Sequence, residues 1–198
     1  MCGRYLITSD IEDIISKYGI EMYHYHYGYI AKKEIFPSDT APVVTYGVKK
    51  ELKLMKWGLS PAFSKTLIIN SRGETIEEKA LFRNSFYTKR CIIPVDAFFE
   101  WKKDAGKKIK HSISLRNLSL FSLGGIYSSF TDTKGAITDC FSIITVSPND
   151  LVSTLHNRMP LILSDNDTDL WLNKESNIED IRKLLRPYSS DNMVLHPA

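Results

Sequence analysis

The residue with the most distinctive chemistry in this sequence is the cysteine at position 2. The chain opens Met1-Cys2-Gly3 with no leader in front of it. Initiator methionine is usually trimmed before a small residue, so Cys2 is expected to become the mature N-terminus. Its amine and thiol would then form a 1,2-aminothiol, which condenses with an aldehyde to an imine and closes to a thiazolidine. Ordinary pKa values of about 7.7–8.0 and about 8.5 leave both groups partly nucleophilic near neutral pH.

Three further clusters carry side chains that could act with Cys2. Asn70 ends an apolar run before a helix start, where it either caps a turn or holds the Cys2 amine. Glu100 is enclosed by three aromatic residues; burial there would raise its pKa toward that of a general acid or base, and the alternative is that it faces solvent. His156 precedes a Pro-containing turn and is either structural or a proton-transfer group.

Other residues suit contact with nucleic acid. Trp57 follows a strand-like run and lies beside Gly58, so it is either a core residue or a ring that stacks on a base. Arginine suits phosphate because its planar fork binds two oxygens. The candidate phosphate contacts are Arg4, Arg72, Arg83, Arg90 and Arg158.

The composition is that of an ordinary globular chain. It has 198 residues, 43% hydrophobic and 25% charged, and a net charge of +3 that is compatible with a nucleic-acid partner. No stretch approaches the ~20 apolar residues of a membrane span, and no signal peptide is evident. Three scattered cysteines and no CxxC pair argue against disulfides and zinc. His24 and His26 would share a strand face, but an aromatic-rich loop is favoured over a metal site.

Periodicity predicts more strands than helices, without βαβ alternation. This favours an α+β fold with a largely antiparallel sheet that curls or doubles over. We expect a single domain over residues 1–198. A capping box at Ser9–Glu12 predicts a helix to Tyr18, and Pro148 is placed at the first position of another. Further helices are expected at 76–82, 165–172 and 178–185. Strands are expected at 41–46, 51–57, 91–95, 98–101, 111–115, 118–127 and 140–146.

Five motifs give the set a recognisable form. They are Met-Cys-Gly-Arg-Tyr, Lys-Trp-Gly-Leu, Asn-Ser-Arg-Gly-Glu-Thr, Arg-Cys-Ile-Ile-Pro-Val-Asp-Ala-Phe-Phe-Glu-Trp and His-Asn-Arg-Met-Pro, in that order. The chain resembles the SOS-response-associated peptidase (SRAP) family of abasic-site-processing proteins, from residue 1 to about 164. The resemblance implies an antiparallel, barrel-like β core, binding of single-stranded DNA at an abasic site, and no cofactor or metal.

The resemblance also implies roles for individual residues. Cys2 would be the nucleophile that forms the thiazolidine, Asn70 would orient its amine, Glu100 would be the general acid/base, and His156 would assist opening of the deoxyribose. The DNA contacts would be phosphates at Arg72 and Arg158 and bases at Trp57 and Pro37, with Arg4 and Arg83 as additional candidate phosphate contacts.

Several expectations complete this interpretation. The protein is expected to be a cytoplasmic monomer that is nucleoid-associated when bound to DNA and acts in the SOS response. It is also expected to expose Cys2 autocatalytically and to show weak lyase activity if ring closure is impaired. The segment Glu34-Ile35-Phe36-Pro37 lacks the Asn that many relatives carry ahead of this proline, which weakens the assignment of Pro37. The ending at His196-Pro197-Ala198 suggests a shortened C-terminal edge. Two alternatives stay open: a thiol amidohydrolase or protease that uses Cys2 with His156 as base, and a non-enzymatic single-strand-binding module.

Overall fold

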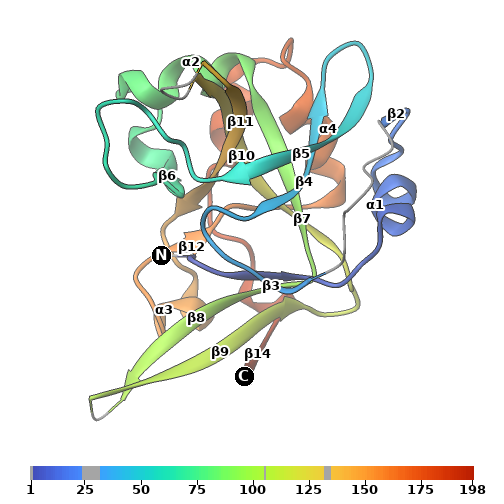
Figure 1. The fold of residues 1–198 in the computed structure, drawn as a ribbon. Coiled ribbons are helices and arrows are strands. Elements are labelled where there is room, and N and C mark those ends of the chain that lie inside the picture. Colours follow the sequence, from blue (N-terminus) through green and yellow to red (C-terminus); the bar gives the residue numbers. More distant parts are fainter. Residues whose placement is uncertain (1, 24–31, 105, 132–134) are drawn as a thin grey trace.

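A closed five-stranded barrel forms the centre of the molecule (Figure 1). The computed structural model describes residues 2–23, 32–104, 106–131 and 135–198, so His24 and His26 lie outside the described residues. Antiparallel ladders join the strands in the order β11–β10–β7–β4–β5, and a short parallel pairing of β5 with β11 closes the ring. The strands are β4 (Thr40–Tyr46), β5 (Lys50–Trp57), β7 (Arg90–Val95), β10 (Phe121–Thr131) and β11 (Ile137–Val146).

A second, fully antiparallel sheet lies below the barrel in Figure 1. Its strands follow the order β14 (Met193–Pro197), β9 (Lys107–Leu115), β8 (Ala97–Asp104), β1 (Tyr5–Ile7) and β3 (Lys32–Ile35). The amino-terminal strand β1 is therefore an inner strand, held between β8 and β3. The predicted α+β class and the barrel-like antiparallel core are both confirmed.

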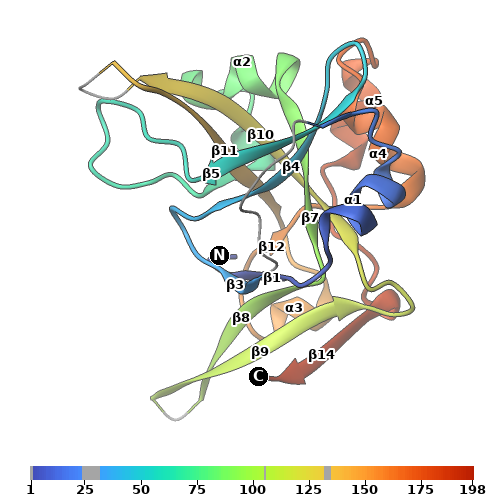
Figure 2. The same cartoon turned by 45° about the vertical axis from the view of Figure 1, so that its right-hand side comes forward.

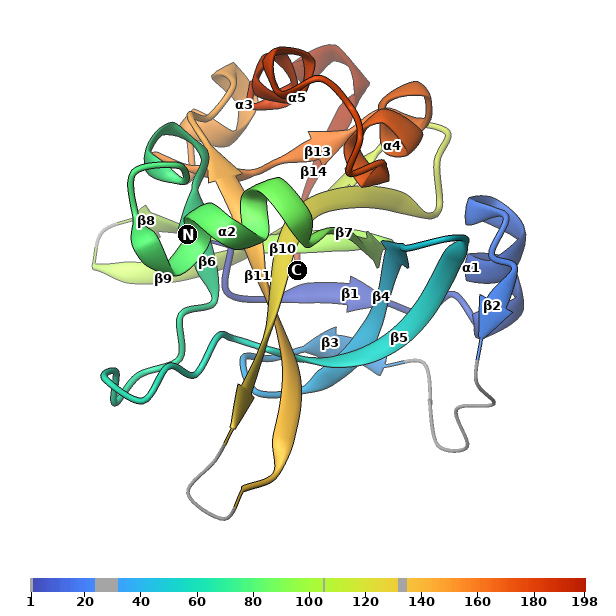
Figure 3. The same ribbon diagram turned by 90° about the horizontal axis from the view of Figure 1, so that it is seen from above.

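Short strands and helices complete the two sheets. The short strands are β2 (Met22–Tyr23), β6 (Asn70–Arg72), β12 (Met159–Pro160) and β13 (Ile162–Leu163). The helices are α1 (Ile11–Tyr18), α2 (Ala80–Thr88), α3 (Asp150–Ser153), α4 (Asp165–Leu172) and α5 (Ile178–Leu184), with 3₁₀ turns at Gly73–Thr75 and Ser190–Asn192. Figure 3 shows α4 and α5 on one side of the barrel and α2 over β7 and β10, with the β10–β11 hairpin and the loop between β5 and β6 extending away from α4 and α5. Within the described ranges, no helix is long and apolar enough to cross a bilayer.

Helix starts differ from the sequence-based expectation in three places. The cap of α1 is Asp10, whose side chain accepts the Asp13 N–H, so Ser9 is not the capping residue. Asn149 caps α3, which begins at Asp150, after Pro148.

The third difference is α2, which begins at Ala80 and ends at Thr88, later at both ends than the helix expected at 76–82. Its buried side chains, Phe82, Ser85 and Phe86, repeat at i, i+3 and i+4, which is the spacing that packs one helix face on the barrel.

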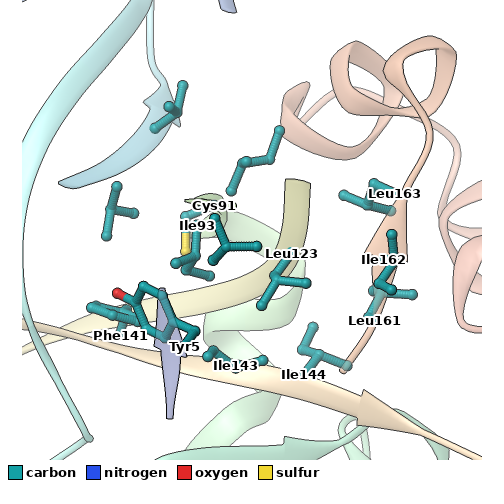
Figure 4. Packing of buried hydrophobic residues seen from close by; sticks show 14 of the residues in the cluster. Tyr5, Cys91, Ile93, Leu123, Phe141, Ile143, Ile144, Leu161, Ile162 and Leu163 are labelled. Carbon is teal, nitrogen blue, oxygen red and sulfur yellow. The ribbon is translucent and has the colours of Figure 1, made fainter. Parts of the chain in front are cut away.

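The barrel interior is packed with aliphatic and aromatic side chains (Figure 4). Tyr5 of β1 reaches into this core and lies 5.1 Å from the ring of Trp57. Gly125 on β10 permits close packing, because a Cβ there would lie 2.4 Å from Ile93 Cδ1 and 2.9 Å from the Ser142 carbonyl oxygen. Tyr5 thus anchors the start of β1 against the packed core.

Candidate active site

Cys2 is buried, three residues before the start of β1 at Tyr5. Its side chain has no exposed surface, and its thiol donates to the Arg4 carbonyl with a sulfur–oxygen distance of 3.7 Å. β1 pairs with β8 through Tyr5 opposite Phe98 and Leu6 opposite Ala97. Because the register is antiparallel, residues that precede Tyr5 lie beside residues that follow Phe98.

Glu100 is the acidic group brought to Cys2 by this register. The Phe99 N–H donates to the Arg4 carbonyl at 3.0 Å, which places the next residue, Glu100, beside the Cys2–Gly3 segment. Glu100 is only 2% exposed, so the alternative in which it faces solvent is wrong. Burial raises the pKa of its carboxyl. Burial, and secondly the charge of Glu100, raise the pKa of the Cys2 thiol.

Asn70 connects Cys2 to the barrel. It begins β6, which pairs in parallel with β11, Asn70 opposite Ile143. Its Nδ2 donates to the Cys2 carbonyl at 3.0 Å. Among the described residues its buried Oδ1 has no hydrogen-bond partner. The contact is with the carbonyl of Cys2 and not with an amine, because in this chain the Cys2 nitrogen is still in a peptide bond; the orphan Oδ1 remains as an acceptor.

His156 follows α3 and is half-buried. Its Nδ1 lies 3.0 Å from the Arg158 backbone N–H, which donates to it. A neutral imidazole whose Nδ1 accepts a hydrogen bond carries its proton on Nε2. The local turn therefore fixes His156 as a donor through Nε2.

The predicted phosphate contacts fall into different environments. Arg158 makes a bidentate ion pair with Glu74, with both nitrogen–oxygen distances 2.7 Å, and also donates to the Thr145 carbonyl at 2.6 Å. The hydrogen bond from Arg158 lowers the pKa of Glu74. Arg72 and Arg83 are exposed, on β6 and α2.

Arg4 is half-buried. Its guanidinium carbon lies over the rings of Phe36 and Trp101, 4.4 and 5.1 Å from their centroids, and it pairs with Glu34 at 3.2 Å. Pro37, directly after Phe36, is half-buried.

Two residues predicted to contact DNA are structural. Trp57 is completely buried, stacks on Phe141 at 6.2 Å and donates from its indole to the Ile69 carbonyl at 3.0 Å, so the expectation that it contacts a base is wrong. Arg90 is 5% exposed and donates to four backbone carbonyls, at Phe86, Tyr87, Trp171 and Asn173. Both side chains replace contact with solvent by hydrogen bonds inside the fold.

Sequence reasoning missed two exposed features. Phe63 is 79% exposed on the loop between β5 and β6, the segment that leads to Asn70. Its signal in the sequence is an aromatic residue within the polar turn Ser60-Pro61-Ala62-Phe63-Ser64-Lys65. The second feature is the β8–β9 hairpin, whose residues 102–110 hold five lysines and one aspartate and which projects from the body in Figure 2. Among the described residues, no group of three or more His, Cys, Asp or Glu could hold a metal ion.

Known proteins resemble this chain over three quarters or more of its length. "Abasic site processing protein YoqW" of Bacillus subtilis is 36% identical across 98% of this chain and 90% of its own length. "Abasic site processing protein HMCES" of Xenopus tropicalis is 26% identical over 75% of this chain and 52% of its own. A crystal structure of a protein from Bacteroides thetaiotaomicron superposes with a TM-score of 0.90 at 26% identity, covering 99% of this chain and 91% of that one. The model of the SOS response associated peptidase family matches residues 1–198, and the chain belongs to the SRAP family.

Proposed function

We propose that this protein processes abasic sites in single-stranded DNA by covalent capture through Cys2. The observation that carries the proposal is the buried cluster in which Cys2 lies beside Glu100 while Asn70 holds its carbonyl at 3.0 Å. Relatives that carry the name "Abasic site processing protein" support it. An abasic deoxyribose opens to an aldehyde, and a 1,2-aminothiol is the group that captures an aldehyde in a closed ring.

The reaction proceeds in two bond-forming stages once Met1 is removed. The Cys2 amine adds to the C1′ aldehyde, and the carbonyl oxygen leaves as water to give an imine. The thiol sulfur then adds to the imine carbon, the thiol proton passes to the nitrogen, and a thiazolidine results. Glu100, with its raised pKa, accepts and returns protons at both stages. His156 donates from Nε2 to promote opening of the sugar.

The thiol's environment favours this reaction over peptide hydrolysis. Burial raises the pKa of the Cys2 thiol, and a thiol that stays protonated is a poor nucleophile toward an unactivated amide. An imine is a stronger electrophile, and Glu100 can take the thiol proton during addition. Under this proposal, peptidase-type chemistry is limited to exposure of Cys2, and lyase activity arises when the thiol cannot close the ring.

Contacts with the strand follow from the exposed residues. Phe63 is the ring proposed to stack on a base, in place of Trp57. Arg72 and Arg83 are proposed phosphate contacts. Arg158 becomes one if a phosphate displaces Glu74 from its guanidinium or shares the guanidinium with Glu74. The protein is proposed to act as a cytoplasmic monomer that meets the nucleoid during the SOS response.

The test uses purified protein whose loss of Met1 is verified by intact mass. It is mixed with a single-stranded oligonucleotide carrying one abasic site, and adducts are separated on a denaturing gel and weighed by mass spectrometry. We expect an adduct with abasic DNA only, lost in Cys2→Ala and retained in Cys140→Ala, the control at another buried thiol. A heat-stable adduct in Cys2→Ala, or none in the trimmed wild type, contradicts the proposal.

A further inference from the structure

A single carboxylate neutralises two cations on the outer face of the second sheet. Glu34 on β3 pairs with Arg4 at 3.2 Å and, through a short contact, with Lys110 on β9. β1 and β8 lie between β3 and β9, so the lysine side chain reaches across the sheet to meet it. Side-chain exposures of 36%, 25% and 21% for Arg4, Glu34 and Lys110 leave the cluster open to an incoming anion.

Aromatic rings surround these charges. The Arg4 guanidinium lies over Phe36 and Trp101, and the Lys110 ammonium lies 4.0 Å from the centre of the Phe99 ring. Phe36 is 42% exposed. Cations that track a phosphate backbone, together with rings on which bases stack, are the combination by which proteins hold single strands without reading sequence.

The cluster adjoins the candidate active site on one side and a basic arm on the other. Arg4 is two residues from Cys2, and Trp101 follows Glu100 on β8. Beyond Lys110 the β8–β9 hairpin carries the surplus of lysines described above and extends away from the body (Figure 2). A polyanion bound at Cys2 would continue onto a surface of complementary charge.

We propose that Glu34 occupies, in the free protein, the place of a backbone phosphate of the DNA strand flanking the abasic site, and that this strand displaces it to reach Arg4 and Lys110. The inference rests on the proposed function and extends it to a second subsite. Ion pairs that remain in contact with solvent contribute little net stability, and these half-buried side chains keep 21–36% exposure, so a phosphate can replace the carboxylate at low cost. The hydrogen bond from Lys110, with burial opposing it, lowers the pKa of Glu34, which therefore stays ionised and competes at neutral pH.

The test measures reversible binding, separate from covalent capture. The probe is a fluorescent single-stranded oligonucleotide with a tetrahydrofuran abasic analogue, which has no aldehyde. Glu34→Gln should bind this oligonucleotide about two- to fivefold more tightly than wild type. The slope of log affinity against log salt concentration should become more negative by about 0.7 for each additional phosphate that the protein neutralises. The matched control is Glu21→Gln, which removes one exposed glutamate paired with Lys49, also at 3.2 Å; it should match wild type.

A second variant, Lys110→Gln, distinguishes a local effect of Glu34 on Lys110 from a general effect of net charge on DNA affinity. Lys110→Gln should weaken binding less when Glu34 is present than in the Glu34→Gln background, where it should remove most of the increase in affinity. Glu34→Gln that is folded by thermal melting but binds no more tightly than wild type overturns the inference, as does strict additivity of the two substitutions. Since no adduct forms with this probe, failure here leaves the Cys2 cross-linking test unaffected, and the reverse also holds.

Discussion

Replacing Asn70 by Ala tests whether the anchoring of Cys2 governs the reaction. The substitution removes the Nδ2 donor that lies 3.0 Å from the Cys2 carbonyl and leaves that carbonyl with one fewer partner in a buried site. A net hydrogen bond is worth about 0.5–1.5 kcal/mol, and leaving a buried acceptor unsatisfied costs about 1–3 kcal/mol. Each ~1.36 kcal/mol is tenfold in rate, so we expect cross-linking to slow by about ten- to a hundredfold.

The assay is single-turnover cross-linking to abasic single-stranded DNA, quenched over time and resolved on denaturing gels. Asn70→Asp provides a sharper comparison, because it keeps the shape and the Oδ1 acceptor but points a second oxygen at the Cys2 carbonyl. We expect it to be slow as well. Asn84→Ala, at an exposed position on α2, is the control and should react like wild type.

The reasoning would be refuted by an Asn70→Ala protein that is correctly folded, trimmed of Met1, and reacts within about twofold of wild type. Such a result would mean that β1 alone fixes Cys2 and that the 3.0 Å contact is incidental. Fast reaction of Asn70→Asp with slow reaction of Asn70→Ala would instead assign the role to Oδ1, the orphan acceptor.

Further predictions concern stability, affinity and pH. Trp57→Ala should lower the free energy of unfolding by about 3–5 kcal/mol in denaturant titrations because it empties a fully buried site, and little change would contradict that burial. Gly125→Ala should cost about 1–3 kcal/mol by overpacking against Ile93 in the same titrations, and a neutral effect would show that the strands can separate. Phe63→Ala should weaken binding of single-stranded DNA by about 1–3 kcal/mol in fluorescence anisotropy at unchanged melting temperature. Burial raises the pKa of Glu100 above its value in the unfolded chain, so its ionisation removes stability as pH rises from the unfolded-state pKa through the folded-state pKa. The melting temperature of Glu100→Gln should therefore match wild type at low pH, exceed it increasingly across that window and keep a constant excess above it, while cross-linking is slower than in wild type; a gap that shrinks across the window would reverse the sign.

Local patterns predicted the elements well where one face is buried. The prediction matched the bounds of α4 and the end of α1, and the barrel strands lie within a few residues of the predicted runs. Closure of the barrel was beyond such reasoning, because it depends on Phe141 of β11 pairing with Trp57 of β5, a residue far earlier in the chain. No short-range pattern encodes a pairing between distant strands.

The candidate site was predicted by residue type more successfully than by environment. Cys2, Asn70 and Glu100 lie together in the fold, and of the two interpretations that the sequence left open for Glu100 the structure shows the buried one. Arg90 and Arg158 show the limit, since an arginine that serves carbonyls or a carboxylate inside the fold looks the same in sequence as one that awaits a phosphate. Only the partner groups, supplied from distant segments, distinguish the two cases.

The inner position of β1 has a consequence for the timing of biosynthesis. The Cys2 segment is made early, but β8, the strand that covers it, ends at Asp104. At roughly 5–20 residues per second, the ribosome needs about 5–20 s to supply that partner. We expect an external aminopeptidase to reach the bond before Cys2 more readily in this interval than after β1 has docked, because Cys2 in the folded chain has no exposed surface. Translation speed over the first hundred or so codons should therefore affect the fraction of molecules that acquire a free aminothiol by external trimming.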